Sequence, residues 1–147
     1  MATIENHVVR DLVALEGGAS CAEAARLMSE RGIGAIAVRD GGRVVGVVTE
    51  RDLVARVLAE GLRPELPIRQ AMRTDVPLVT PSTTELDCTA LMRDHTTRHL
   101  LVAERGEVVG IISMRDVIRL MLDEKEWLIG QLHTFIDGRD FPAAAAG

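Results

Sequence analysis

The sequence predicts an α/β fold in which two similar units, each of about 60 residues, pack about a pseudo-two-fold axis. The main observation is a repeat: residues 46–53 read GVVTERDL and residues 110–117 read GIISMRDV. The same register holds without a gap from Ser20 to Leu58. Two units are too few for a solenoid, so a packed pair is expected. The pattern of each unit indicates the order strand–helix–strand–strand–helix (βαββα).

The first helix of each unit is predicted to begin at a hydroxyl residue. Ser20 and Thr84 are each followed three residues later by a carboxylate, which is the spacing of a capping box. Apolar residues then recur at helical spacing. They are Ala24, Leu27 and Met28 in the first unit, and Cys88, Leu91 and Met92 in the second. Gly32 and Gly34 are typical of a helix end.

Two strands and a second helix follow in each unit. The strands are expected at 35–38 and 44–48, and at 99–102 and 108–112, with short Gly-containing turns between them. The next helix runs from Glu50 to about Glu60 in the first unit.

The strand that precedes the first helix is predicted in only one unit. Residues 75–81 read as a short strand in the second unit. Residues 14–19 of the first unit indicate a strand that is truncated or replaced by a Gly turn. Residues 1–6 are expected to form a loose start.

The last helix is predicted to be longer than its counterpart and to carry an apolar stripe as far as Ile136. We expect its final turns to pack on another subunit, the alternative being that the helix folds back on its own chain. The first repeat is expected to span 7–61, a linker 62–67, the second repeat 68–122, a helical extension 123–138 and a disordered tail 139–147.

Composition narrows the classes of partner. The net charge of −5 argues against a nucleic acid or an anionic membrane as the main partner. No apolar stretch reaches membrane-spanning length and no signal core opens the chain, so a cytoplasmic protein is expected. Cys21 and Cys88 lie in Ala/Leu-rich helical stretches and are expected to be buried thiols, with a disulfide or redox pair as the alternative.

The repeated hydroxyl-x-x-Asp motif has two interpretations. Thr49 to Asp52 and Ser113 to Asp116 have capping-box spacing, which is a structural role. A helix start directly after a strand also offers free N–H groups to an anion, and an acid one turn into the helix can accept the two hydroxyls of a ribose. Arg51 and Arg115 add positive charge beside the motif.

Arg98 and His99 form a second candidate group at the start of a strand. Two basic residues there suit phosphate oxygens, and the alternative is an exposed charged pair. His95 and His99 have a spacing that suits a metal only within a helix, and no third ligand is evident, so no metal is predicted. The sequence contains no Gly-rich phosphate loop, nucleophile elbow, CxxC or HExxH, and we expect no catalysis.

These residues resemble the cystathionine-β-synthase (CBS) domain family, whose members occur as tandem pairs called Bateman modules. The resemblance rests on the two repeated blocks, each with its upstream hairpin and helix. It covers roughly Val8 to Met121. It implies clefts for AMP, ADP, ATP or NAD between the units. The residues implied in the second cleft are Val79, Thr80, Arg98, His99, Leu100, Ser113, Arg115 and Asp116. Those implied in the first are Gly34, Ala35, Ile36, Thr49, Arg51 and Asp52.

The resemblance assigns the ribose diol to the two aspartates and ribose or phosphate to the two hydroxyl residues. The expected function is therefore a non-catalytic sensor of an adenine nucleotide, acting as a homodimer on an unidentified regulated protein. The alternative is a structural homodimerisation module with degenerate clefts. The first cleft is the weaker expectation, because its unit lacks the basic pair and most of the expected strand.

Overall fold

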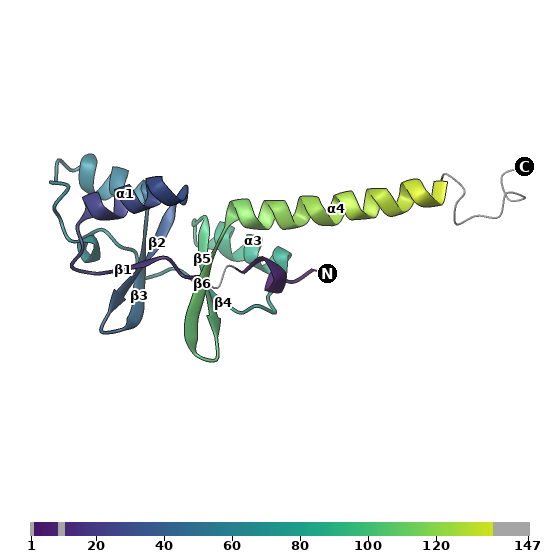
Figure 1. The fold of residues 1–147 in the computed structure, drawn as a ribbon, viewed down its shortest axis with the longest axis horizontal. Helices are drawn as coiled ribbons and strands as arrows, with labels where there is room; N and C mark the ends of the chain where they lie inside the picture. The colour runs from purple at the N-terminus through teal and green to yellow at the C-terminus, as the bar shows by residue number, and fades with distance from the viewer. Residues whose placement is uncertain (1, 9–10, 137–147) are drawn as a thin grey trace, which may run out of the picture.

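The computed structural model describes residues 2–8 and 11–136, and it contains two small sheets that face each other (Figure 1). The strand order is β1-β2-β3 in one sheet and β4-β5-β6 in the other. The strands are β1 (Ala14–Glu16), β2 (Ala35–Asp40), β3 (Arg43–Thr49), β4 (Leu78–Val79), β5 (His99–Glu104) and β6 (Glu107–Ser113). The mixed α/β fold that the repeat predicts is confirmed.

Helices cover the outer face of each sheet. The α-helices are α1 (Cys21–Arg31), α2 (Glu50–Leu53), α3 (Glu85–Asp94) and α4 (Met114–Ile136). Short 3-10 turns form η1 (Glu5–His7) and η3 (Ile68–Gln70), and α2 continues as a π-helical segment η2 (Val54–Leu58). The second helix of the first unit is therefore present as predicted, although most of it is wound as a π-helix.

The two units have the same strand topology and share a register shift at equivalent positions. In each sheet the first strand pairs in parallel with the second, which pairs antiparallel with the third. The antiparallel register shifts between Val38 and Arg39 in one unit and between Val102 and Ala103 in the other. These positions are equivalent in the repeat. The βαββα order inferred from sequence is confirmed in both units, and the register shift is a detail that the sequence did not predict.

The prediction for the strand before α1 was wrong. Residues 14–16 form β1, which is three residues long, whereas β4 has only two. The pairing to β2 continues on both sides of β1, since Ala37 N donates to Val13 O and Gly17 N donates to Arg39 O. The glycines therefore follow the strand and turn the chain after it, and they do not replace it.

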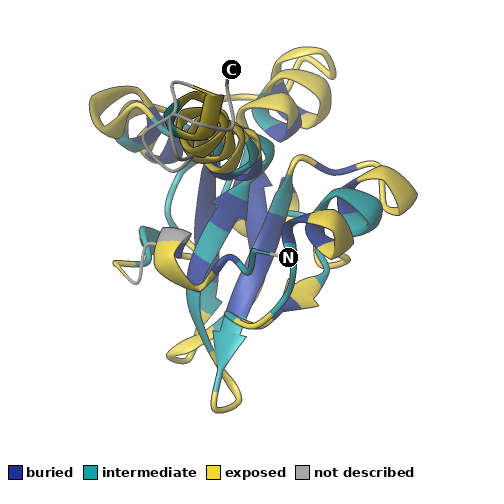
Figure 2. Cartoon of the chain, turned by 90° about the vertical axis from the view of Figure 1, so that its right-hand side faces the viewer, coloured by how far each residue is buried: buried dark blue, intermediate teal, exposed yellow. Residues whose placement is uncertain are grey.

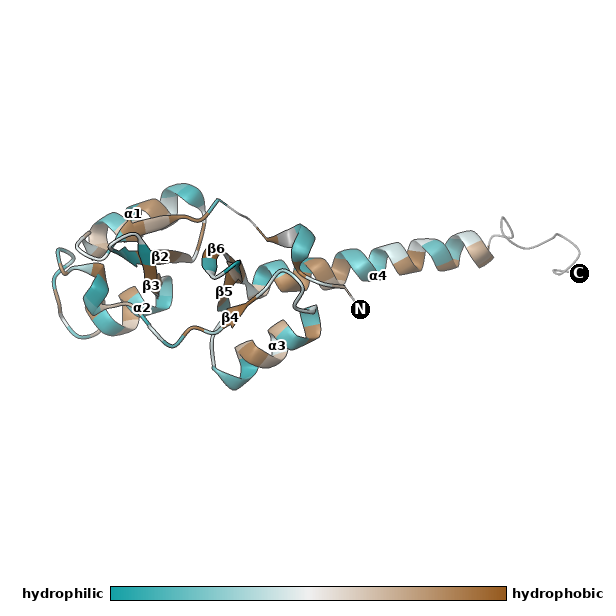
Figure 3. Cartoon of the chain, turned by 90° about the horizontal axis from the view of Figure 1, so that it is seen from below, coloured by the Kyte–Doolittle hydropathy of each residue, from teal (hydrophilic) through white to brown (hydrophobic). Residues whose placement is uncertain are grey.

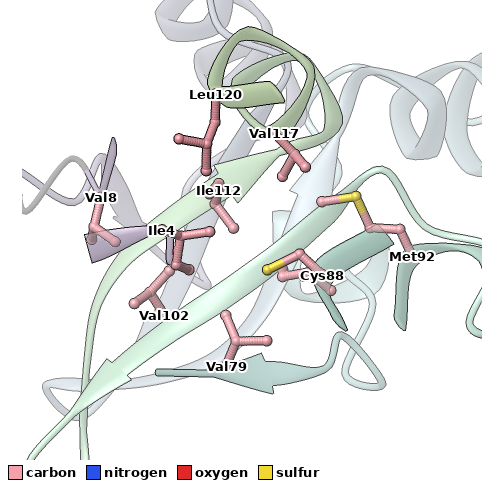
Figure 4. Close-up of a cluster of buried hydrophobic side chains, with 10 residues drawn as sticks. Ile4, Val8, Val79, Cys88, Met92, Val102, Ile112, Val117 and Leu120 are labelled. Carbon is pink, nitrogen blue, oxygen red and sulfur yellow. The ribbon is translucent and has the colours of Figure 1, made fainter. Parts of the chain in front are cut away.

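The expected loose start was also wrong for the part of it that the structure describes. Thr3 forms an isolated bridge with Thr84, and Ile4 N donates to Thr83 O. Ile4 is fully buried in the core of the second unit (Figure 4). The N-terminal segment thus packs on the second unit, whose helix α3 begins beside it.

Alternate residues of each central strand face different cores. Leu100 and Val102 on β5 point to α3 and α4 and join the cluster shown in Figure 4. Leu101, between them, packs with Ala35 and Val47 of the other sheet. Period-two alternation therefore gives each sheet one face for its helices and one face for the other unit. Figure 2 shows these strands as the most buried part of the chain.

Helix α4 continues as one helix to Ile136, well beyond the sheets, and does not fold back on the chain (Figures 1 and 3). Of the predicted extension 123–138, residues 137 and 138 lie outside the described residues. The predicted disordered tail 139–147 also lies outside them. No described helix combines the length and apolarity needed to cross a bilayer.

Candidate ligand-binding site

The two hydroxyl-x-x-Asp motifs adopt the same geometry at the starts of α2 and α4. Asp52 Oδ2 accepts hydrogen bonds from Thr49 N and Thr49 Oγ1, both at 2.9 Å. Asp116 Oδ2 accepts from Ser113 N and Ser113 Oγ, both at 2.8 Å. The hydroxyl oxygen accepts in turn from the aspartate backbone N–H at 3.1 Å in each unit. The structural interpretation of this motif as a capping box is confirmed.

The two aspartates differ in what remains available. Asp52 is buried, and its Oδ1 lies 3.8 Å from Nε of Arg56. Asp116 is half-buried, and its Oδ1 accepts no hydrogen bond from any residue within 2–8 or 11–136. A carboxylate oxygen can accept more than one hydrogen bond, so the cap leaves Asp116 with acceptor capacity for a ligand.

The starts of β2, α2 and β5 converge at one junction between the units. A Cβ atom added to Gly34 would lie 3.5 Å from Oε2 of Glu50 and 3.8 Å from Nε2 of His99. His99 belongs to the second unit and the other two residues to the first. The junction is thus shared, and the expected division of the site residues into one set per unit does not describe it.

Acidic residues surround His99 from both units. Burial is the main cause that lowers the pKa of His99, and Arg98 lowers it further. Asp116, Glu50 and Asp52 oppose this shift, in that order. The pKa of His99 stays below its ordinary value, so the imidazole is neutral at pH 7 and offers an N–H donor instead of a positive charge. Arg98, which is exposed, carries the permanent charge of the pair.

The remaining predicted residues fall into three environments. Arg51 and Arg115 are exposed on the first turns of their helices. Ile36 and Leu100 are fully buried in the helix-side cores, so only their backbone groups can meet a ligand. Ala35 lies in the contact between the sheets.

Val79 and Thr80 line a cavity of about 440 Å³. Its other lining residues are Leu78, Thr83, Asp87, Ala90, Leu91 and Asp94. A second cavity, of about 160 Å³, lies against both hairpins and is lined by residues that include Arg73, Val76 and Leu101. Neither of these two cavities is lined by Asp52 or Asp116.

Glu50 is the residue of this junction that the sequence interpretation missed. It precedes Arg51 in the repeated block, where the second unit has Met114. That asymmetry was the only available signal, because an acid in the first turn is ordinary for a helix. Among the residues that the structure describes, no group of three or more His, Cys, Asp or Glu side chains is placed to hold a metal.

Three proteins illustrate what this chain is similar to. An uncharacterized 17.7 kDa protein of Acidianus ambivalens is 35% identical over 125 residues, covering 84% of this chain and 71% of that protein. A CBS-domain containing protein from Agrobacterium tumefaciens has a TM-score of 0.76 at 31% identity, covering 82% of this chain and 99% of that one. A CBS domain protein from Pyrobaculum aerophilum, complexed with AMP, has a TM-score of 0.69 at 28% identity, covering 78% and 89%.

The family model for the CBS domain matches the chain twice, over residues 4–59 and 68–123. The two matches fall on the two βαββα units, and the structural neighbours share their arrangement. The chain therefore belongs to the CBS-domain family and contains two CBS domains in tandem.

Proposed function

We propose that this chain is a regulatory module that binds an adenosine-containing ligand, AMP, ADP, ATP or NAD, where its two CBS domains meet. The observation that carries the proposal is the state of Asp116, whose Oδ1 keeps free acceptor capacity beside His99 at the start of α4. The Pyrobaculum protein of the same fold is complexed with AMP, which supports an adenylate as the ligand class.

Each group at the junction has a role in this proposal. Asp116 Oδ1 accepts the hydroxyls of the ribose, as acidic residues do in dinucleotide folds. Ser113 keeps the carboxylate oriented through its two hydrogen bonds. Arg98 supplies charge to a phosphate, and neutral His99 donates one hydrogen bond to it. Glu50 disfavours a large anionic charge close to Gly34, because its carboxylate lies there.

Regulation requires that the ligand bind one state of an assembly better than another. We propose a homodimer as that assembly. Val54 and Leu58 on η2 are 58% and 65% exposed, and the equivalent residues Ile118 and Leu122 on α4 are also exposed. Four exposed apolar side chains at equivalent positions of the two units suit a symmetric contact with a second copy. A change in this contact would transmit binding to the regulated protein.

Calorimetric titration with AMP, ADP, ATP and NAD, together with thermal shift, tests the ligand. A ligand at 100 times its Kd stabilises the folded state by about 2.7 kcal/mol. We expect Asp116→Asn to lower affinity for the bound nucleotide at least tenfold, which corresponds to about 1.4 kcal/mol.

A matched control separates lost binding from a lost cap. Thr84 caps α3 by accepting from Asp87 N, so Thr84→Ala removes the same kind of bond away from the junction. This control should lower the melting temperature and keep the ligand-induced shift. If no nucleotide at millimolar concentration gives heat or a thermal shift, the sensor proposal is wrong.

A structural dimerisation module with degenerate clefts is the second candidate. It is favoured by two observations: Oδ2 of each aspartate is already engaged in its cap, and both cavities lie away from the aspartates. Under this function Asp116→Asn changes stability only, and the protein remains a dimer in the absence of any nucleotide.

A further inference from the structure

Helix α4 carries a row of exposed apolar side chains along its whole length. The row consists of Ile118, Leu122, Ile129, Leu132 and Ile136, and we call it the α4 seam. Each of these side chains is between 48% and 76% exposed. Their spacings are three, four or seven residues, which is the repeat of the a and d positions in a coiled coil. Lys125 occupies the one remaining position of the row.

The α4 seam is separate from the face that holds α4 to its own unit. Val117 and Leu120 are buried against α3 and β6, and they lie on a different side of the helix from Ile118 and Leu122. Trp127, which is 66% exposed, lies on the side opposite the seam, because nine residues from Ile118 correspond to two and a half turns. Within residues 2–8 and 11–136, the seam therefore stays about half or more exposed from Ile118 to Ile136.

A second copy of this chain suits the seam better than another occupant. The 3-4 spacing is self-complementary, since each apolar side chain fits between those of an identical helix. From Ile118 to Ile136 the seam runs for about 27 Å. Its first two residues, Ile118 and Leu122, are two of the four exposed residues that we propose for the dimer contact, so the seam continues that contact along the helix. Most of it lies beyond the sheets, where no other described segment of this chain covers it (Figures 1 and 3).

We propose that α4 helices of two copies pair along the α4 seam as a two-stranded coiled coil with Lys125 at a core position. A charged residue at one core position weakens such a pair and restricts its register. The proposal rests on the homodimer proposed above and is independent of nucleotide binding.

Three variants of the full chain test the seam by sedimentation velocity over a range of concentrations. Leu132→Glu places a charge in the seam and should weaken dimerisation at least tenfold. Trp127→Glu places the same charge on the same helix outside the seam and should leave the dimer unchanged. Lys125→Leu completes the row and should tighten dimerisation at least tenfold, a gain that a damaged protein cannot mimic.

The outcomes distinguish the seam from the dimer itself. A dimer that resists Leu132→Glu and ignores Lys125→Leu would overturn the seam and leave a dimer on the CBS domains. A monomeric wild-type chain at all concentrations would overturn both. Equal losses in Leu132→Glu and Trp127→Glu, with reduced helical circular dichroism in each, would also overturn the seam, because the position on the helix would then not matter.

Discussion

Replacing Gly46 by alanine is expected to loosen the joint between the two CBS domains. Gly46 lies on β3 beside Val47, which forms a bridge with Arg73 near the start of the second domain. A Cβ atom on Gly46 would lie 2.6 Å from Arg73 O and 2.8 Å from Met72 Sδ. Real Cβ atoms do not approach a carbonyl oxygen this closely, so one of the two segments must move.

The carbonyl of Arg73 has little freedom to move. It accepts from Val47 N at 2.9 Å, and Arg73 N donates to Val47 O at 2.8 Å. Overpacking of this kind costs about 1–3 kcal/mol. In a chain of this size each kcal/mol lowers the melting temperature by roughly 2–4 °C. We therefore expect Gly46→Ala to melt roughly 2–12 °C below the wild type.

Thermal unfolding followed by circular dichroism measures this difference, and Gly130→Ala is the control. Gly130 lies within α4, and a Cβ atom there would meet nothing within 4 Å. The same substitution should then stabilise the helix by up to about 1 kcal/mol, because glycine is a poor helix former. A melting temperature of Gly46→Ala equal to or above the wild type would refute the argument from steric overlap.

Three further predictions concern titratable groups. Burial first, and then the neighbouring Glu124 carboxyl, raise the pKa of Glu85, whose Oε2 has no hydrogen-bond partner in the described chain. The contribution of Glu85 to the free energy of unfolding is present below its ordinary pKa and is lost as pH rises through the raised value. The variant Glu85→Gln should therefore have a free energy of unfolding about 1 kcal/mol higher than the wild type at pH 7, measured by urea unfolding. Burial lowers the pKa of His99, so its contribution to the free energy of unfolding is present above pH 6.5 and is lost as pH falls through the lowered value. The variant His99→Asn should therefore show a flatter dependence of the free energy of unfolding on pH between pH 5 and 7. An unchanged pH dependence would contradict this prediction. Burial raises the pKa of Cys88 to about 11, so alkylation at pH 8 should require unfolding, and rapid modification of the folded chain would be inconsistent with the buried site.

Local signals in the sequence were sufficient for the units themselves. The hydroxyl-x-x-acid spacing predicts caps because both partners lie within one turn, and Ser20 accepts from Glu23 N as expected. The turn at Gly41 takes a positive φ of 59°, and its counterpart in the second unit has Arg105 at 52° followed by Gly106. These features depend on neighbours within a few residues, so a repeat read in register is enough to place them.

Features that depend on packing between distant segments were not predictable in this way. The burial of Ile4 depends on its contact with the second unit, whose residues come much later in the sequence. The junction of Gly34, Glu50 and His99 exists only because the two sheets meet with the starts of β2 and β5 adjacent. In the sequence, Gly34 and Glu50 belong to the first unit and His99 to the second. Only the folded structure brings the three residues together.

The two nearly identical hydroxyl-x-x-Asp motifs differ in their surroundings. Arg56 donates to Met72 O at 2.9 Å and lies beside Asp52, so this arginine ties the second helix of the first domain to the first residues of the second domain. The equivalent residue of the second unit is Leu120, which is buried in the helix-side core and offers nothing to Asp116. In the first domain Oδ2 of Asp52 is therefore engaged in its cap, and Oδ1 faces the arginine that joins the two domains. Asp116 of the second domain has the same cap but no arginine at the equivalent position, and this difference is why we propose Asp116 as the ligand of the ribose.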